Sequence, residues 1–258
     1  MLRCENIHCS YDKSKKFIEN LNIDIPKSEI TTILGPNGSG KSTLLSMLAC
    51  FNKPLEGNVF IENTNLSTLK FKEIAKRIAT VHQHNEPPED ITVEKLVSFG
   101  RVPYNKCRDI DKKTNEEIIN WAIESTSLED IRDEKVMSLS GGQRQRAFIA
   151  MALAQKTKVL LLDEPTTYLD MYHQIEVLEL VKKLNEEFGI TIVMVLHDIN
   201  QAIKYSHNII VMKDGSIIES GKPEKVINEK TIKDVYNVQG IICNINENEM
   251  YFVPTKAC

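Results

Sequence analysis

The chain has 258 residues, of which 41% are hydrophobic, enough apolar material for the core of one large α/β domain or two modest ones. Its formal net charge is -4 at pH 7 and no block of five like charges occurs, so composition does not point to nucleic acid or an anionic membrane surface as a partner. The longest apolar run, residues 190–196, is far shorter than the ~20 residues of a membrane-spanning helix, and the chain is not expected to cross a bilayer.

Six cysteines stand at positions 4, 9, 50, 107, 243 and 258, and none belongs to a CxxC pair. The N-terminal residues are polar and do not resemble a signal peptide. Together these features predict reduced thiols in the cytosol.

The first 35 residues predict two kinds of strand. Residues 1–30 alternate short β-like runs with turn residues, which favours a small antiparallel sheet. Residues 30–35, ITTILG, are rich in β-branched side chains and predict a buried strand.

A helix is expected in KSTLLSMLACF, residues 41–51, with three leucines on one face: Leu44, Leu45 and Leu48.

The rest of the chain predicts a helical lobe followed by a βαβ unit. Residues of about 90–157 carry helical patterns with little strand character. After them, KVLLLD (158–163) and TIVMVLHD (191–198) are apolar runs ending in acids, typical of parallel strands covered on both faces. Between these runs, helical spacing predicts an amphipathic helix that ends at Gly189. Its apolar face is formed by Ile175, Leu178, Val181, Leu184 and Phe188.

The strongest motif is GPNGSGKS, which fits G-x-x-x-x-G-K-[ST] from Gly35 to Ser42. In this pattern glycines let the backbone wrap the phosphates, Lys41 reaches the β and γ oxygens, and Ser42 ligates Mg²⁺. The alternative is a structural glycine turn before a helix. The expected strand before the motif and helix after it favour a phosphate loop.

Acids and a histidine stand at the ends of the two later strands. Asp163 is placed to hold Mg²⁺ through water, and Glu164 is the candidate that orients or deprotonates the attacking water. His197 follows the second strand, at the sheet edge where ligands bind in open α/β folds, and is a candidate γ-phosphate contact. The alternatives are two acids that cap a strand and a satisfied polar histidine. Gln83, at a strand-to-loop junction, is a weaker candidate on its own.

A second helix start with anion-binding character occurs in LSGGQRQRAFIA, residues 139–150. Ser140 and Gln143 form an S-x-x-Q capping box, and the alternative is a well-capped helix and nothing more. Two glycines in one turn each cost roughly 1 kcal/mol relative to alanine, which capping does not explain. Close approach of the backbone to a ligand phosphate does explain them.

In order along the chain, the phosphate loop, a glutamine loop, LSGGQ, LLLDEP, a downstream LD and LHD make a motif set that resembles the ATP-binding cassette (ABC) ATPases. The resemblance covers most of the chain. It implies an α/β P-loop NTPase (RecA-like) core with a small antiparallel β subdomain and an inserted α-helical subdomain. On this basis residues 1–258 are one nucleotide-binding domain: about 1–89 and 158–230 form the core with the β subdomain, about 90–157 the helical subdomain, and about 231–258 a C-terminal extension.

The resemblance also implies a head-to-tail homodimer in which each ATP lies between the phosphate loop of one protomer and LSGGQ of the other. Gln83 and Asp163 would then meet Mg²⁺ with Ser42, Glu164 would be the catalytic acid, and His197 a switch histidine. Asp170 would lie in a dimer-contacting loop. The implied ATP contacts are Tyr11, stacked on adenine, the phosphate-loop residues Gly35, Asn37, Gly38, Ser39, Gly40, Lys41, Ser42 and Thr43, and the residues that face the opposite γ-phosphate, Ser140, Gly142 and Gln143.

Finer similarity is to the ATPase subunits of iron(III)-siderophore, haem and vitamin B12 importers, carried by LSGGQRQRAFIAMALAQ, LLLDEPTTYLDMYHQIEVLELV, VSFGRVPY and YFVP. Such a subunit is peripheral on the cytoplasmic face of the membrane and works with a separate permease and, indirectly, an extracytoplasmic solute-binding protein. Two departures from the family pattern are Ser28, where Gly is usual, and His207, where Asp is common. The alternatives are a soluble cassette ATPase of iron–sulfur cluster assembly and an ordinary P-loop kinase or GTPase, although the latter leaves LSGGQ unexplained.

Overall fold

The computed structural model describes residues 2–10, 17–104, 112–246 and 249–258, and the described chain divides into two compact units. One unit comprises residues 1–68 and 191–258, and the other comprises residues 69–190. In neither range does a described helix combine the length and apolar character needed to cross a bilayer.

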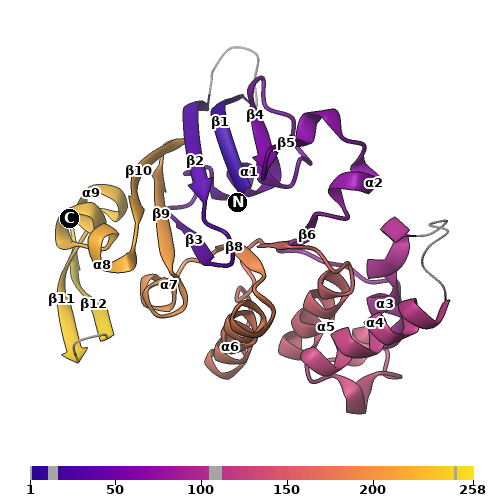
Figure 1. Cartoon of the computed structure of the whole chain (residues 1–258). Coiled ribbons are helices and arrows are strands. Elements are labelled where there is room, and N and C mark those ends of the chain that lie inside the picture. The colour runs from indigo at the N-terminus through magenta and orange to yellow at the C-terminus, as the bar shows by residue number, and fades with distance from the viewer. Residues whose placement is uncertain (1, 11–16, 105–111, 247–248) are drawn as a thin grey trace. The chain divides into compact units, whose positions relative to one another are not determined.

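The first unit contains the phosphate-loop motif and most of the strands (Figure 1). Its N-terminal elements are β1 (Leu2–Cys9), β2 (Ile18–Ile25), β3 (Ile30–Leu34), α1 (Lys41–Leu48), β4 (Glu56–Ile61), β5 (Thr64–Asn65) and the 3-10 turn η1 (Leu66–Thr68). Its C-terminal elements are β8 (Thr191–Val195), α7 (Ile199–Tyr205), β9 (Asn208–Lys213), β10 (Ser216–Gly221), α8 (Pro223–Val226), α9 (Glu229–Tyr236), β11 (Val238–Asn246) and β12 (Glu249–Ala257).

Strand β3 lies at the centre of the parallel strands of this unit, between β8 and β9. All five residues of β3 and all five of β8 are buried, as their β-branched and apolar sequences predict. Strand β10 adds to β9 in the antiparallel direction. The motif after β3 therefore begins at the end of a strand fixed by hydrogen bonds on both edges.

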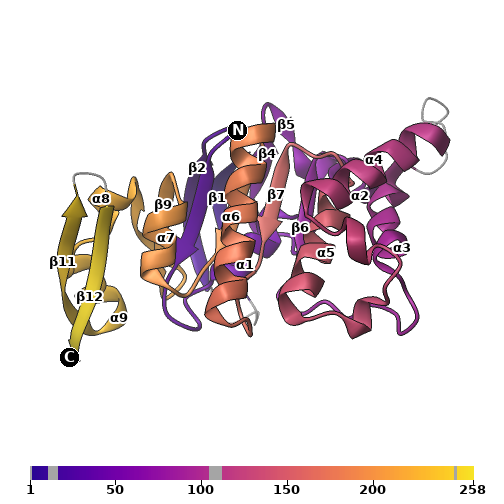
Figure 2. The same ribbon diagram turned by 90° about the horizontal axis from the view of Figure 1, so that it is seen from below.

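The expected antiparallel sheet is confirmed, with strand order β2-β1-β4-β5. Two of its strands, β4 and β5, follow α1 and were not anticipated from the first 30 residues. Helix α1 ends at Leu48, short of the predicted 51, and Cys50 has a left-handed φ of 57°. At the other end of the chain, β11 and β12 form a hairpin beside α9 (Figure 2).

The second unit holds the expected helical lobe between two parallel strands, β6 (Ile78–Val81) and β7 (Val159–Leu162). Helices α3 (Val93–Ser98), α4 (Lys112–Ser125) and α5 (Gly141–Leu153) pack against one another in this lobe (Figure 1). The other elements of the unit are α2 (Phe71–Ile74), η2 (Phe99–Tyr104), η3 (Glu129–Ile131), η4 (Val136–Ser138) and α6 (Met171–Phe188).

Helix α6 packs on α5 and differs in two ways from its prediction. It begins at Met171, four residues before the expected start, because Asp170 caps it, and it ends as predicted at Gly189 with a left-handed φ of 62°. Ile175 and Phe188, assigned to the apolar face, are 44% and 39% exposed. Phe188 instead packs edge-on against Trp121 of α4, with ring centroids 5.1 Å apart. The buried face is narrower than the spacing suggested.

Candidate functional site

The phosphate loop in the first unit is held by its own lysine. The side chain of Lys41 is buried, and its Nζ donates hydrogen bonds to the carbonyl oxygens of Gly35 at 2.9 Å and Pro36 at 3.0 Å. A Cβ on Gly35 would lie 2.3 Å from the carbonyl oxygen of Met212 and 2.6 Å from Oγ of Ser39. Only glycine fits where the loop leaves β3, so the sequence pattern and the packing agree.

Helix α1, which follows the loop, begins without a side-chain cap. Its N-cap is Gly40, with a left-handed φ of 103°. Within the described ranges, five other helices begin with a capping side chain, and the four-residue helices α2 and α8 also lack one. The five caps are Thr92, Ser140, Asp170, Asp198 and Asn228. Because the first N–H groups of a helix seek an acceptor and carry its positive dipole end, an anion can take the place of the missing cap.

Tyr236, the last residue of α9, has its hydroxyl next to the backbone of Gly35 and was missed by sequence reasoning. This hydroxyl is buried, and among the described residues it has no hydrogen-bond partner of ordinary geometry. Burial raises the pKa of this phenol, and the nearby Gly35 backbone opposes the shift. Tyr236 lies two hundred residues from the motif, and no local pattern connects the two.

Two other predicted residues belong to the first unit. His197 is exposed two residues after the end of β8, beside Asp198, which caps α7 by accepting from the Gln201 backbone N–H at 2.8 Å. The sequence thus ends a strand and starts a helix within three residues, which fixes the backbone at His197. Tyr11 lies outside the described residues.

In the second unit the structure brings two predicted residues together at the end of β7. Gln83 Nε2 donates to Glu164 Oε2 at 2.6 Å, and Thr167 Oγ1 donates to the same oxygen at 3.0 Å. Glu164 has a left-handed φ of 49°, a conformation that costs a non-glycine residue energy and is common at active sites. Its neighbour Asp163 is anchored by its N–H to the Val81 carbonyl at 2.9 Å. Thr167 was not anticipated.

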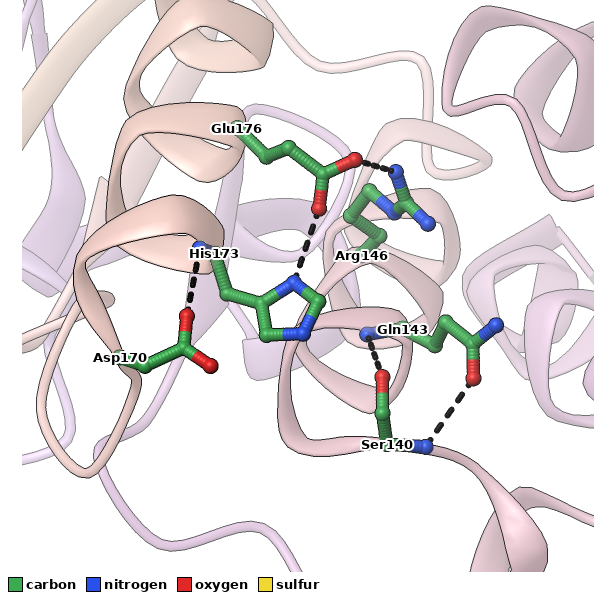
Figure 3. Close-up of polar contacts among 6 residues, drawn as sticks. All are labelled: Ser140, Gln143, Arg146, Asp170, His173 and Glu176. Carbon is green, nitrogen blue, oxygen red and sulfur yellow. Dashed lines mark hydrogen bonds and ion pairs between the residues drawn. The ribbon is translucent and has the colours of Figure 1, made fainter.

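The capping box predicted at the start of α5 is confirmed (Figure 3). The Gln143 N–H donates to Ser140 Oγ at 3.3 Å, and the Ser140 N–H donates to Gln143 Oε1 at 3.0 Å. The explanation proposed for the glycines is incomplete, because a Cβ on Gly142 would lie 2.6 Å from Nδ1 of His173 in α6. Packing within the chain already requires a glycine at this position, whether or not a phosphate approaches it.

Asp170 caps the start of α6 and belongs to a group of contacts between α5 and α6 (Figure 3). Its Oδ1 accepts from the His173 N–H at 3.0 Å. The His173 ring Nδ1 lies 3.0 Å from Glu176 Oε2, and Arg146 Nη1 of α5 donates to Glu176 Oε1 at 2.8 Å. The sequence held one weak signal for this group, a histidine and a glutamate three residues apart on a helix.

The two departures from the family pattern have structural correlates. Ser28 has a left-handed φ of 57°, which explains why a glycine is usual there, and its N–H donates to Thr191 Oγ1 at 2.9 Å. His207 accepts from the Ile30 N–H through Nδ1 at 3.0 Å, a bond that an aspartate could also make. Both residues support β3.

These features are typical of an α/β ATPase with a phosphate loop and a signature helix, α5, whose start is the LSGGQ signature motif, and comparison with known proteins identifies the family. The model of the ABC transporter family matches residues 18–167. The chain belongs to the ABC transporter family, in which it is an ATP-binding protein and an ATPase.

Curated relatives span nearly the whole chain. The petrobactin import ATP-binding protein FpuC of Bacillus anthracis is 45% identical over 247 residues, covering 95% of this chain and 90% of its own. The probable siderophore transport system ATP-binding protein YusV of Bacillus subtilis (strain 168) is 47% identical over 237 residues, covering 92% and 85%.

Solved structures agree with the family and the fold. An inward-facing putative metal-chelate type ABC transporter is similar with a TM-score of 0.84 and 27% identity, covering 99% of this chain and 97% of that one. A dimeric ATP-binding cassette in a post-hydrolysis state, bound to ADP and Pi, is similar with a TM-score of 0.75 and 33% identity, covering 86% and 99%.

Proposed function

We propose that this ATPase powers the import of an iron(III)-siderophore, or of a related iron, haem or cobalamin complex, through a separate permease. The proposal rests on the siderophore importers among its relatives and on the metal-chelate transporter among similar structures. The chain would sit peripherally on the cytoplasmic face of the membrane, and an extracytoplasmic binding protein would deliver the solute. Nucleic acid has no part in this function.

The observation that carries ATP binding is the loop from Gly35 to Thr43. It combines a buried lysine and a helix start that lacks a side-chain cap. ATP would place its β- and γ-phosphates there, and Lys41 would exchange carbonyl oxygens for phosphate oxygens. Asn37, Gly38, Ser39, Gly40 and Thr43 would contribute the rest of the loop. Tyr11 would stack on adenine.

Magnesium suits the donors that the motifs offer. Ser42 supplies a hydroxyl oxygen, Asp163 a carboxylate and Gln83 an amide oxygen, and Mg²⁺ takes oxygen ligands and commonly keeps several waters beside one or two carboxylates and substrate phosphates. Bound Mg²⁺ would neutralise charge on the β- and γ-phosphates. Because Gln83 uses Nε2 to hold Glu164, its Oε1 remains the atom for the metal side.

Hydrolysis requires a water aligned with the γ-phosphate. Glu164, held by Gln83 and Thr167, would orient this water and accept its proton. His197 would donate to the γ-phosphate as negative charge moves onto it. Ser140, Gly142 and Gln143 would meet the partner protomer's ATP, with Asp170 in the contacting loop.

The test is Glu164→Gln with Glu186→Gln, an exposed glutamate of α6, as control. We expect Glu164→Gln to bind ATP, to lose ATP hydrolysis and to accumulate as an ATP-dependent dimer in size-exclusion chromatography. The control Glu186→Gln should hydrolyse ATP at the rate of the parent protein. A Glu164→Gln protein that hydrolyses ATP normally and stays monomeric contradicts the proposal.

The transport assignment needs a second measurement. The tagged chain, purified from mildly solubilised native membranes, should retain a multi-span permease and an extracytoplasmic binding protein. The binding protein can then be titrated with ferric siderophores, haem and cobalamin. Recovery of soluble iron–sulfur scaffold proteins alone would leave the ATPase chemistry in place and overturn the transport role.

A further inference from the structure

Three side chains that follow the LSGGQ and LD motifs join the start of α5 to the start of α6. Glu176 bonds through one oxygen to the His173 ring and through the other to the Arg146 guanidinium, at 3.0 Å and 2.8 Å (Figure 3). The side chains of Glu176, His173 and Arg146 are 26%, 27% and 16% exposed, so water screens their interactions only in part. We call Arg146, His173 and Glu176 the strut.

The strut reaches the signature motif by direct packing. The His173 ring fills the space where a Cβ of Gly142 would be, with three ring or Cβ atoms within 2.9 Å of that point. The backbone of His173 is itself the group capped by Asp170. One residue therefore contacts the second glycine of the signature and the aspartate of the loop before α6.

Within the strut, the partly buried guanidinium of Arg146 relies on Glu176 as its ion-pair partner. The Nε atom of Arg146 is buried and has no hydrogen-bond partner in the described parts of the chain. Removing the negative charge of Glu176 would leave the positive charge of a partly buried guanidinium without its ion-pair partner. Removing one partner of a partly buried ion pair costs more free energy of unfolding than removing one partner of an exposed pair. The contact between α5 and α6 at this level would then loosen.

We propose that Arg146, His173 and Glu176 are positioning residues that hold the signature helix and the Asp170 loop as one rigid body, so that both reach the partner's ATP together when the dimer closes. This inference rests on the proposed function, which assigns Ser140, Gly142 and Asp170 to the dimer contact. The strut belongs to the second unit and the phosphate loop to the first, and the proposed role of the strut is in closure rather than in nucleotide capture.

The experiment compares Glu176→Gln with Glu186→Gln, both in the Glu164→Gln background. Glu186 is a matched control because it forms an exposed i,i+4 ion pair with Lys182 on the same helix, at 3.9 Å. We expect Glu176→Gln to raise the ATP concentration for half-maximal dimer, measured by analytical ultracentrifugation, at least about fivefold, the lower end of coupling between sites. ATP affinity of the monomer, measured with a fluorescent ATP analogue, should stay unchanged, and Glu186→Gln should alter neither quantity.

Hydrogen exchange of the monomer gives a second readout that does not depend on dimerisation. Glu176→Gln should speed exchange of backbone amides in the first turns of both α5 and α6, and His173→Ala should do the same. Equal exchange in Glu176→Gln and Glu186→Gln, or a parent-like ATP dependence of dimerisation, overturns the strut. If the Glu164→Gln parent does not dimerise with ATP, the proposed dimer fails instead, and the exchange comparison still decides whether the strut exists.

Discussion

Replacing Gly142 with alanine should have opposite effects on stability in two backgrounds. In the parent chain the new Cβ would lie 2.6 Å from Nδ1 and 2.7 Å from Cγ of His173. Forcing a methyl group into such a space costs about 1–3 kcal/mol, whereas alanine gains up to about 1 kcal/mol over glycine from helix propensity. The net expectation is a fall in the free energy of unfolding of up to about 3 kcal/mol.

In the His173→Ala background the imidazole ring is absent, so Gly142→Ala keeps only the gain in helix propensity. Gly142→Ala should then raise the free energy of unfolding by up to about 1 kcal/mol, and the double-mutant cycle should report a coupling of about 1–3 kcal/mol. Urea unfolding of the nucleotide-free protein, followed by circular dichroism, measures all four variants.

Equal destabilisation by Gly142→Ala in both backgrounds would refute the packing explanation. The same four proteins also separate packing from ligand approach. If the double variant folds well but forms the ATP-dependent dimer less readily than His173→Ala alone, a phosphate must also come close to this backbone.

Three further predictions concern the caps and the thiols. Asp170→Ala should lower stability by about 1 kcal/mol in thermal or urea unfolding, because the His173 N–H loses its acceptor, whereas Asp170→Asn should keep most of it. Ser140→Asp should keep the helix cap and its circular dichroism signal yet abolish ATP-dependent dimerisation, because it places a negative charge opposite the γ-phosphate; a dimer as stable as the parent's would contradict the assignment of Ser140. Burial raises the pKa of Cys4 to about 12 and of Cys50 to about 11, from an ordinary 9.0. Iodoacetamide should therefore modify both slowly at pH 8 in the folded protein, and rapid labelling would contradict the raised pKa values. Because these thiols ionise at a lower pH in the unfolded chain than in the folded protein, the free energy of unfolding should fall as pH rises above about 9 and should not change below it.

Local patterns predicted the parts of the site whose determinants lie close together in sequence. The strand, glycine loop and helix around Lys41 need only consecutive residues, and the capping box of Ser140 and Gln143 spans a single turn. The left-handed φ of Ser28 was foreshadowed by its departure from a usual glycine.

Patterns failed where a second element decides the outcome. Helical spacing placed Ile175 and Phe188 on a buried face, but the width of that face depends on what packs against α6. Thr167 and Tyr236 were missed because their roles depend on Glu164 and Gly35 as placed by the fold. His173 likewise became informative only once its ring was seen against Gly142.

The capping box at α5 also determines which kind of ligand its helix start can accept. Ser140 Oγ and Gln143 Oε1 each accept a backbone N–H, so these two oxygens are turned toward the chain. The hydroxyl proton of Ser140 and the amide protons on Gln143 Nε2 then remain for an outside partner. Each oxygen already uses one of its two lone pairs within the helix start, whereas these protons are not used there, which favours a group made only of acceptors, such as a terminal phosphate, over a cation. The bonds that hold the helix in shape would thereby also favour an anion over a cation at this helix start.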